Sequence, residues 1–265
     1  CITFDYNKSD YFLNYIINIL KLLNPFKNFT LLNLCPFMTK INDTKPEIKK
    51  VISIAFALIL GFGFTSVAQE GAYTEAMQTN IKAMKDASGT QDYQAVANTF
   101  SRISKMNSSE WLPAYYTGFV YVIMSFQSGL TDDERDAYLD IAGKYADQAA
   151  GISENNSEII ALQGYVKMAE LSVKPAIRGP FMSGTIMKLF GKAMELDPEN
   201  PRAMLLMGRM KYGTAQFFKS GTEEACALIN GSLKLFEKEH DRGILPHWGK
   251  PMAEQVSKSC NSSQE

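Results

Sequence analysis

The residue types that carry acid–base or metal chemistry are sparse in this 265-residue sequence and stand apart from one another. Its two histidines, His240 and His247, are seven positions apart, and no carboxylates or thiols gather beside them as a metal site requires. The acidic run from Asp132 to Asp136 is typical of a first helical turn, where acids complement the helix dipole. No hydrolase, metalloprotease or phosphate-loop motif is present, so we expect a non-enzymatic protein without a cofactor or bound metal.

Two cysteines in the C-terminal part of the chain, Cys226 and Cys260, are the remaining candidates for covalent chemistry. They can form a disulfide if this part of the chain enters an oxidising compartment. The alternative is one buried thiol on a helix and one thiol near a polar tail. Sequence spacing does not give the distance between the two cysteines, so both alternatives stand.

Residues 38–68 contain the three parts of a secretory signal peptide. Lys49 and Lys50 precede an apolar run over residues 51–64, and small residues at 66–68 supply a cleavage site. The apolar run is shorter than the ~20 residues that a bilayer-spanning helix needs. We therefore expect cleavage after Ala68, a periplasmic or secreted domain over residues 69–265, and no stable membrane span in that domain.

Residues 1–37, which precede Met38, have an unusual composition. They contain no Ala, Gly, Val, Glu, Arg, Gln or Met, a bias typical of AT-rich DNA translated outside a gene. We expect translation to start at Met38 and residues 1–37 to be non-native upstream translation. The alternative, a membrane segment over Tyr11–Leu34, is interrupted by Lys21, Pro25 and Lys27.

The composition of residues 69–265 favours a single all-α domain. Methionine and alanine are plentiful, and prolines fall between the periodic segments. The net charge is slightly negative and no basic stripe stands out, so nucleic acid is not an expected partner.

Apolar spacing predicts about eight helices in four consecutive pairs. Their expected spans are Tyr73–Asp86, Gln91–Met106, Glu110–Phe126, Thr131–Gly151, Ser157–Ser172, Ser183–Leu196, Pro201–Phe218 and Thr222–Lys238. A loop with two prolines is expected over Val173–Ser183, and a short final helix over Pro251–Lys258.

An internal repeat connects these helices. The same 18-residue spacing separates a helix end from a later glycine three times: Phe100 to Gly118, Ala146 to Gly164, and Phe190 to Gly208. Each unit predicts a helix end, a short turn and a helix with a small residue where the neighbouring helix approaches closely.

Through Phe190, Ala193, Pro198 and Gly208, the chain resembles the tetratricopeptide repeat (TPR) family, and the resemblance extends loosely over residues 90–238. It implies an all-α, TPR-like helical-hairpin array (an α-solenoid) of about four helix pairs. Two units are about ten to twelve residues longer than that family's pattern, which predicts longer first helices (A helices) or longer loops after them. With the signal peptide, the chain looks like a secreted TPR-like protein of Bacteroidetes-type bacteria.

The resemblance also implies a concave groove lined by the A helices. Carried onto this sequence, the family's pattern assigns the groove to Tyr115, Phe119, Tyr165, Met168, Arg209 and Tyr212. Arg202, six positions before Gly208, is a further candidate. Such residues are common in protein and peptide sites, so we expect a protein or peptide partner. The alternative is a helical protein of the cell envelope that binds a small molecule or lipid, and aromatic residues on helices are also common core residues.

Two further segments are candidates for contacts. The expected loop over residues 173–183, with Lys174, Arg178 and Phe181, is a second candidate binding surface, and a simple crossover is its alternative. Trp248 is expected to cover the apolar end of the helix stack, with direct ligand contact as the alternative.

Overall fold

The computed structural model describes residues 70–262, and every structural statement below concerns this part of the chain. The expected signal peptide (38–68) and upstream segment (1–37) lie outside the described residues. The first helix covers residues 70–86. The others are α4 (Thr90–Met106), α5 (Trp111–Ser125), α6 (Asp132–Ile152), α7 (Ser157–Val173), α8 (Pro175–Leu196), α9 (Pro201–Phe218), α10 (Glu223–Lys238) and α11 (Lys250–Ser262). The described residues form nine helices and no strand, so the predicted all-α class is confirmed.

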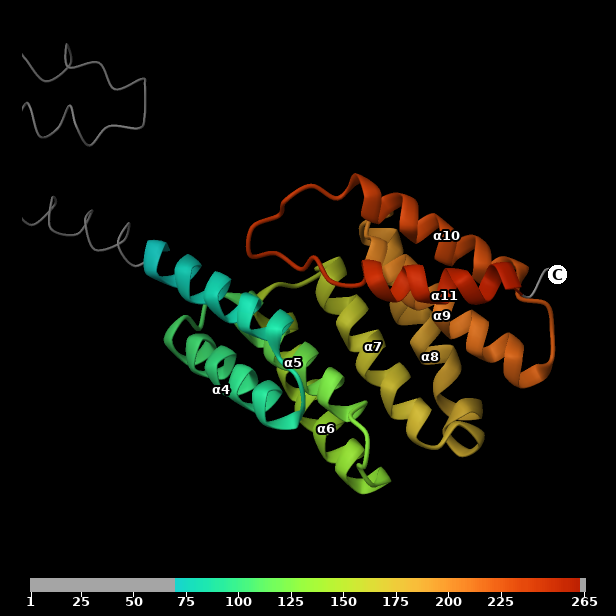
Figure 1. Cartoon of the computed structure of the whole chain (residues 1–265), viewed down its shortest axis with the longest axis horizontal. Helices are drawn as coiled ribbons and strands as arrows, with labels where there is room; N and C mark the ends of the chain where they lie inside the picture. The colour runs from blue at the N-terminus through green and yellow to red at the C-terminus, as the bar shows by residue number, and fades with distance from the viewer. Residues whose placement is uncertain (1–69, 263–265) are drawn as a thin grey trace, which may run out of the picture. The chain divides into compact units, whose positions relative to one another are not determined.

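Consecutive helices pack as hairpins, which confirms the predicted array of about four helix pairs (Figure 1). Helix 70–86 packs on α4, where the buried Asn80 donates to the Val96 carbonyl, and α5–α6, α7–α8 and α9–α10 follow. Successive pairs contact one another as well, through α4–α5, α6–α7 and α8–α9. We call helix 70–86, α5, α7 and α9 the A helices, and α4, α6, α8 and α10 the B helices.

The repeated glycines lie where an A helix meets its B helix, which confirms the close approach predicted from their spacing. A Cβ on Gly164 would overlap the ring of Phe190 on α8. A Cβ on Gly208 would lie 2.8 Å from Ile229 Cγ1 and 3.1 Å from the Ala225 carbonyl oxygen. These contacts allow the buried faces of the two helices to come together without a gap.

The extra residues of the repeat lie in the B helices, not in the A helices or the loops after them. Helix α6 has 21 residues and α8 has 22, whereas α5 and α7 have 15 and 17. The early start of α6 accounts for part of its length. This start is stabilised by a capping box between Thr131 and Glu134 and by Asp132 and Asp133 in the first turn.

The prediction of a loop over residues 173–183 is wrong, because α8 begins at Pro175 and only Lys174 separates it from α7. Pro175 occupies the first helical position, where proline is well tolerated. Pro180 lies on an exposed stretch of α8, so water can bind the backbone carbonyl that loses its helical hydrogen bond at this proline. Arg178 anchors this end of α8 by donating to both carboxylate oxygens of Asp136 at 2.7 and 2.6 Å.

The chain continues past the last hairpin, as Figure 1 shows, through a connection that leaves α10 and returns to α11. We call residues 239–249 the C-terminal segment. Helix α11 is longer than the short helix expected over 251–258, and it packs on α10 and on Leu205 of α9. A disulfide joins Cys226 of α10 to Cys260 of α11, with their Cα atoms 5.6 Å apart. No helix of the described region is both long and apolar enough to cross a membrane.

Candidate functional site

The C-terminal segment packs against the A helices through Trp248. The Trp248 ring stacks on Phe119 of α5, with centroids 4.4 Å apart, and on Tyr165 of α7 at 5.7 Å. Its indole N–H donates to the Tyr115 hydroxyl at 2.9 Å, and the Tyr116 hydroxyl donates to the Ile244 carbonyl at 3.0 Å. Trp248 therefore packs across α5 and α7. The prediction from the sequence, that Trp248 covers the end of the helix stack, is wrong.

A buried ion cluster anchors the same segment. Arg202, whose side chain is fully buried, donates to both oxygens of Glu158 at 2.7 Å and to Glu239 at 2.6 and 3.2 Å. Arg242 donates to Glu158 and to Glu239 at 3.0 Å each. Two guanidinium groups thus face two carboxylates, and the charges balance. The cluster ties α7, α9 and the C-terminal segment together.

The cluster also sets the ionisation of its members. Burial opposes the charge of Glu239, but hydrogen bonds and charges from Arg202 and Arg242 outweigh it, so the pKa of Glu239 lies below its ordinary value. Burial raises the pKa of the Tyr115 phenol well above its ordinary value, so this hydroxyl stays protonated and neutral.

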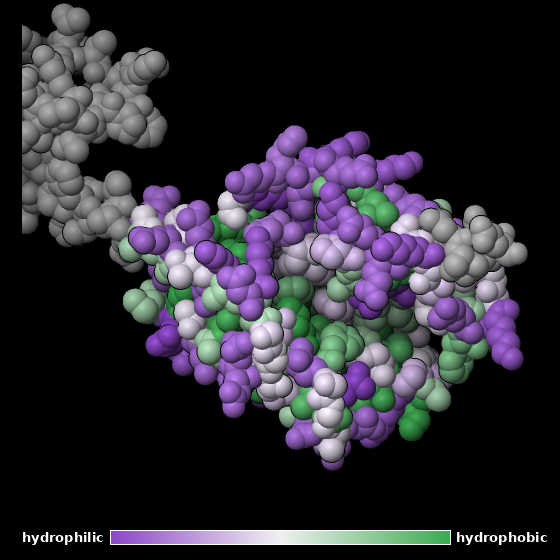
Figure 2. All heavy atoms as spheres, in the orientation of Figure 1, coloured by the Kyte–Doolittle hydropathy of each residue, from purple (hydrophilic) through white to green (hydrophobic). Residues whose placement is uncertain are grey.

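The rest of the A-helix surface, beside the C-terminal segment, is partly exposed and mostly apolar. We call it the A-helix face, and its members come from α5 (Phe126, at the end of the helix), α7 (Met168), α9 (Arg209 and Tyr212) and α11 (Met252). Phe126 stacks on Tyr165 at 6.3 Å, and Arg209 lies beside the Tyr165 hydroxyl. Figure 2 shows hydrophobic residues gathered in the middle of this view, between α5 and α7, with hydrophilic residues around them.

Arg209 is the unusual member of the A-helix face. It donates to the thioether sulfur of Met252 at 2.7 Å, a weak acceptor, and no carboxylate of the described residues forms an ion pair with it. Its side chain is half-buried among apolar groups. Because a guanidinium has five N–H donors, Arg209 can still bind a carboxylate beside its contacts with Met252 and Tyr165.

The seven residues assigned to the groove from the sequence fall into two groups. Tyr115, Phe119, Tyr165 and Arg202 are buried, and the C-terminal segment covers them. Met168, Arg209 and Tyr212 are partly exposed on the A-helix face. The chain itself therefore occupies one part of the expected groove and leaves another part accessible.

Sequence reasoning missed Phe126 and Met252 as members of this face. Phe126 lies just past the last turn of α5 and is 45% exposed. Its place at the end of an expected helix was the available signal. No pattern pointed to Met252, because α11 belongs to no repeat unit.

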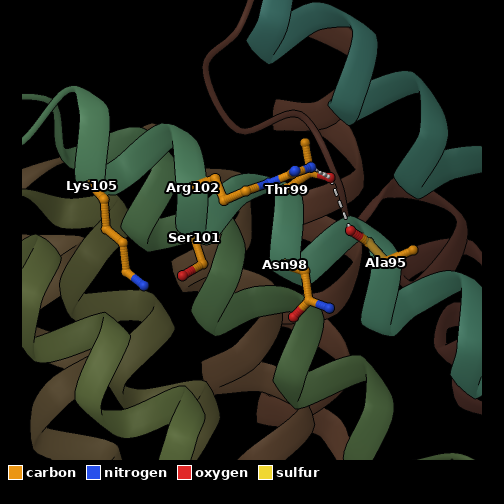
Figure 3. Close-up of a pocket in the computed structure, with 6 residues that line it drawn as sticks. All are labelled: Ala95, Asn98, Thr99, Ser101, Arg102 and Lys105. Atoms are coloured by element: carbon orange, nitrogen blue, oxygen red, sulfur yellow. Dashed lines mark hydrogen bonds between the residues drawn. The ribbon is translucent and has the colours of Figure 1, made fainter.

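Two other surface features are less suited to a ligand. A shallow depression of about 520 Å³ lies along α4 and is lined by Ala95, Asn98, Thr99, Ser101, Arg102 and Lys105 (Figure 3). All six residues belong to one helix, so no second element encloses the depression. Lys174 and Arg178, from the second candidate surface, form ion pairs with Asp132 and Asp136, while Phe181 of the same segment is 83% exposed.

Metal-ligand groups do not cluster among the described residues: no three His, Cys, Asp or Glu side chains come together to hold an ion. His240 is exposed, and His247 lies half-buried beside Trp248 in the C-terminal segment.

Comparisons with known proteins give a match in structure. No protein-family model matches the chain. No curated protein matches it either. The HusA haemophore from Porphyromonas gingivalis matches with a TM-score of 0.65 and 26% sequence identity, over 73% of this chain and 94% of that chain.

This match qualifies the resemblance drawn from the sequence. The helical-hairpin array resembles the HusA fold, and P. gingivalis belongs to the Bacteroidetes, the group expected from the sequence. No family model supports membership of the TPR family itself. A haemophore also favours the small-molecule alternative over the peptide-binding hypothesis.

Proposed function

We propose that this protein is an exported, non-enzymatic carrier that binds haem on its A-helix face. The observation that carries the proposal is the similarity to the HusA haemophore, which spans nearly all of that chain. The signal peptide expected over residues 38–68 and the Cys226–Cys260 disulfide support export, because disulfides persist in oxidising compartments.

The chemistry of the A-helix face suits this ligand. Haem is a flat apolar ring with two carboxylates on its rim. Phe126, Met168, Tyr212 and Met252 offer aromatic and thioether surface for the ring, and such groups adapt well to a flat apolar ligand. Arg209, which has no acidic partner among the described residues, is the natural contact for one carboxylate.

The same geometry argues against an extended peptide as the ligand. A peptide lying along the A helices would need the surface of Tyr115, Phe119 and Arg202, and the C-terminal segment already covers these residues. A compact ligand needs only the accessible part of the A-helix face.

The test is an absorbance titration of the purified protein with ferric haem. Wild type should bind saturably, and Arg209→Gln should weaken binding about tenfold or more, because a charge-assisted hydrogen bond is lost. Arg102→Gln is the matched control, since Arg102 is exposed on α4 and forms no ion pair in the described region. The absence of saturable binding, or equal weakening by both substitutions, would contradict the proposal.

A further inference from the structure

The disulfide between Cys226 and Cys260 packs against one member of the A-helix face. The two cysteines form a small buried cluster with Ile229, and Tyr212 and Val256 pack against this cluster. Tyr212 lies on α9 and belongs to the A-helix face, whereas the bond joins α10 to α11. The bond is therefore part of the packing that holds the Tyr212 ring in place.

Helix α11 also supplies a second member of the face, Met252. Its thioether sulfur accepts a hydrogen bond from Arg209 at 2.7 Å. Arg209 is the group that the proposed function assigns to a ligand carboxylate. The position of α11 therefore determines where the Met252 side chain lies, and with it the contact that orients the Arg209 guanidinium.

Apart from the disulfide, α11 makes a small contact with the rest of the array. Its buried residues between positions 250 and 260 are Ala253, Ser257 and Cys260, whose short side chains bury little apolar surface. The Ser257 hydroxyl donates to Asn230 Oδ1 of α10 at 2.7 Å. Helix α11 stands outside the four hairpins, with α10 as its main neighbour. Because a disulfide limits how far the two joined elements can separate, this bond supplies much of what keeps α11 against α10.

We propose that the disulfide between Cys226 and Cys260 controls the affinity of the A-helix face for its ligand. The oxidised bond keeps the supports of Tyr212 and Met252 in place, and its reduction lets α11 move away from α10 and weakens the site. This inference rests on the proposed function and adds a redox control to it. It makes the two cysteines positioning residues, because they act through Tyr212 and Met252 and do not touch the ligand.

The chemistry of the control is thiol–disulfide exchange with a dithiol. The dithiol supplies two electrons and two protons, so the Sγ–Sγ bond breaks, two cysteine thiols form and the reductant becomes a cyclic disulfide. The bond is buried, but Cys260 lies in the last turn of α11, which ends at Ser262. Because the ends of helices fray, opening of this turn gives the reductant access to the bond.

The experiment titrates the purified protein with ferric haem in its oxidised and reduced states. The reduced state is prepared with dithiothreitol, which is then removed by anaerobic gel filtration so that it does not reduce the iron, and free thiols are counted before and after the titration. Reduced protein should bind haem about tenfold more weakly, the size expected when an aromatic and a thioether contact are lost. The double variant Cys226→Ala/Cys260→Ala should bind as weakly, with or without dithiothreitol treatment.

A second pair of variants separates positioning from a general effect on folding. In Tyr212→Ala/Met252→Ala, oxidised protein should already bind weakly and reduction should weaken binding little further, because the two changes remove the same contacts. Met106→Ala is the matched control, since Met106 is an exposed methionine at the end of α4, and it should keep both the affinity and the redox effect of wild type. Circular dichroism should show that reduced wild type keeps most of its helical signal.

The remaining outcomes separate the two proposals. If oxidised wild type binds haem, and the reduced protein and the double cysteine variant bind it equally well or more tightly, the redox inference is overturned while the haem-binding function stands. The same holds if reduction removes most of the helical signal, or if the redox effect is undiminished in Tyr212→Ala/Met252→Ala. If oxidised wild type does not bind haem saturably, both are overturned.

Discussion

Arg202 shows how a residue assigned to a binding groove can instead hold the fold together. Its guanidinium is fully buried and neutralises Glu158 and Glu239 together with Arg242. Replacing it would leave two buried carboxylates facing one remaining cation. Removing one partner of a buried ion pair is costly because the other charge stays buried and uncompensated.

We therefore expect Arg202→Met to lower the free energy of unfolding by about 3–5 kcal/mol. Denaturant unfolding followed by circular dichroism measures this. Arg102→Met, at an exposed arginine without an ion pair in the described region, should change stability by less than about 0.5 kcal/mol. A loss no larger for Arg202→Met than for this control would show that the cluster contributes little.

Helix α9 offers a comparison of two glycines in the same element. Gly208 touches Ile229 and the Ala225 carbonyl of α10, whereas nothing lies within 4 Å of the Cβ position on Gly213. Gly208→Ala should destabilise by about 1–3 kcal/mol, because the helices must move apart. Gly213→Ala should stabilise by about 0.5–1 kcal/mol through helix propensity. Melting curves of the two variants check this, and equal shifts would contradict the packing account.

At the residue scale, the sequence predicted these close contacts but not the exposure of the groove residues. The 18-residue spacing located Gly164 and Gly208, because close packing leaves a local signature in residue size. It did not show that Phe119 is covered, because the side chain that covers it, Trp248, lies 129 positions further along the chain. A contact at that separation leaves no periodic pattern.

The C-terminal segment is the element that the repeat pattern could not predict. It carries Trp248 and Glu239, and its ion pairs with Arg202 attach it to the A helices. Because the pKa of Glu239 is lower in the folded protein than in the unfolded chain, its ion pairs stabilise the segment at pH values above the unfolded value of about 4.3. This stabilisation is lost as the pH falls further, through the lower folded-state pKa.

We expect acidification below about pH 4.3 to loosen the segment. In a Trp111→Phe background, where Trp248 is the only tryptophan of the sequence, the emission should shift to longer wavelength as the pH falls. Glu239→Gln should show part of this shift already at neutral pH. An emission spectrum that stays constant in wild type to pH 3, and is identical in Glu239→Gln, would rule out this role of Glu239.

At the scale of elements, helix positions were largely predictable and helix lengths were not. Apolar periodicity located all four hairpins, because each helix buries one face. It failed at the start of α8, where two prolines favoured a loop, yet Pro175 occupies a permitted first position and Arg178 anchors the turn to α6. The ion pair between Arg178 and Asp136, which are 42 positions apart, outweighs the preference of the two prolines for a loop.

At the largest scale, the described part of the chain is an array of hairpins with its own C-terminal part packed on one side. The disulfide between α10 and α11 and the buried ion cluster hold this part in place, and Trp248 fills the surface between α5 and α7. What stays accessible is an apolar face with one guanidinium that lacks an acidic partner in the described region. The sequence predicted a peptide groove on these helices, and in the structure the C-terminal segment covers part of that surface and leaves the A-helix face accessible.

The most direct test of haem binding on the A-helix face is nuclear magnetic resonance of the ¹⁵N-labelled protein titrated with iron-free protoporphyrin IX, which avoids paramagnetic broadening. The account predicts saturable shifts concentrated at amides near Phe126, Met168, Arg209 and Met252, with little change along α4. Shifts concentrated on α4, or none that saturate, would contradict it.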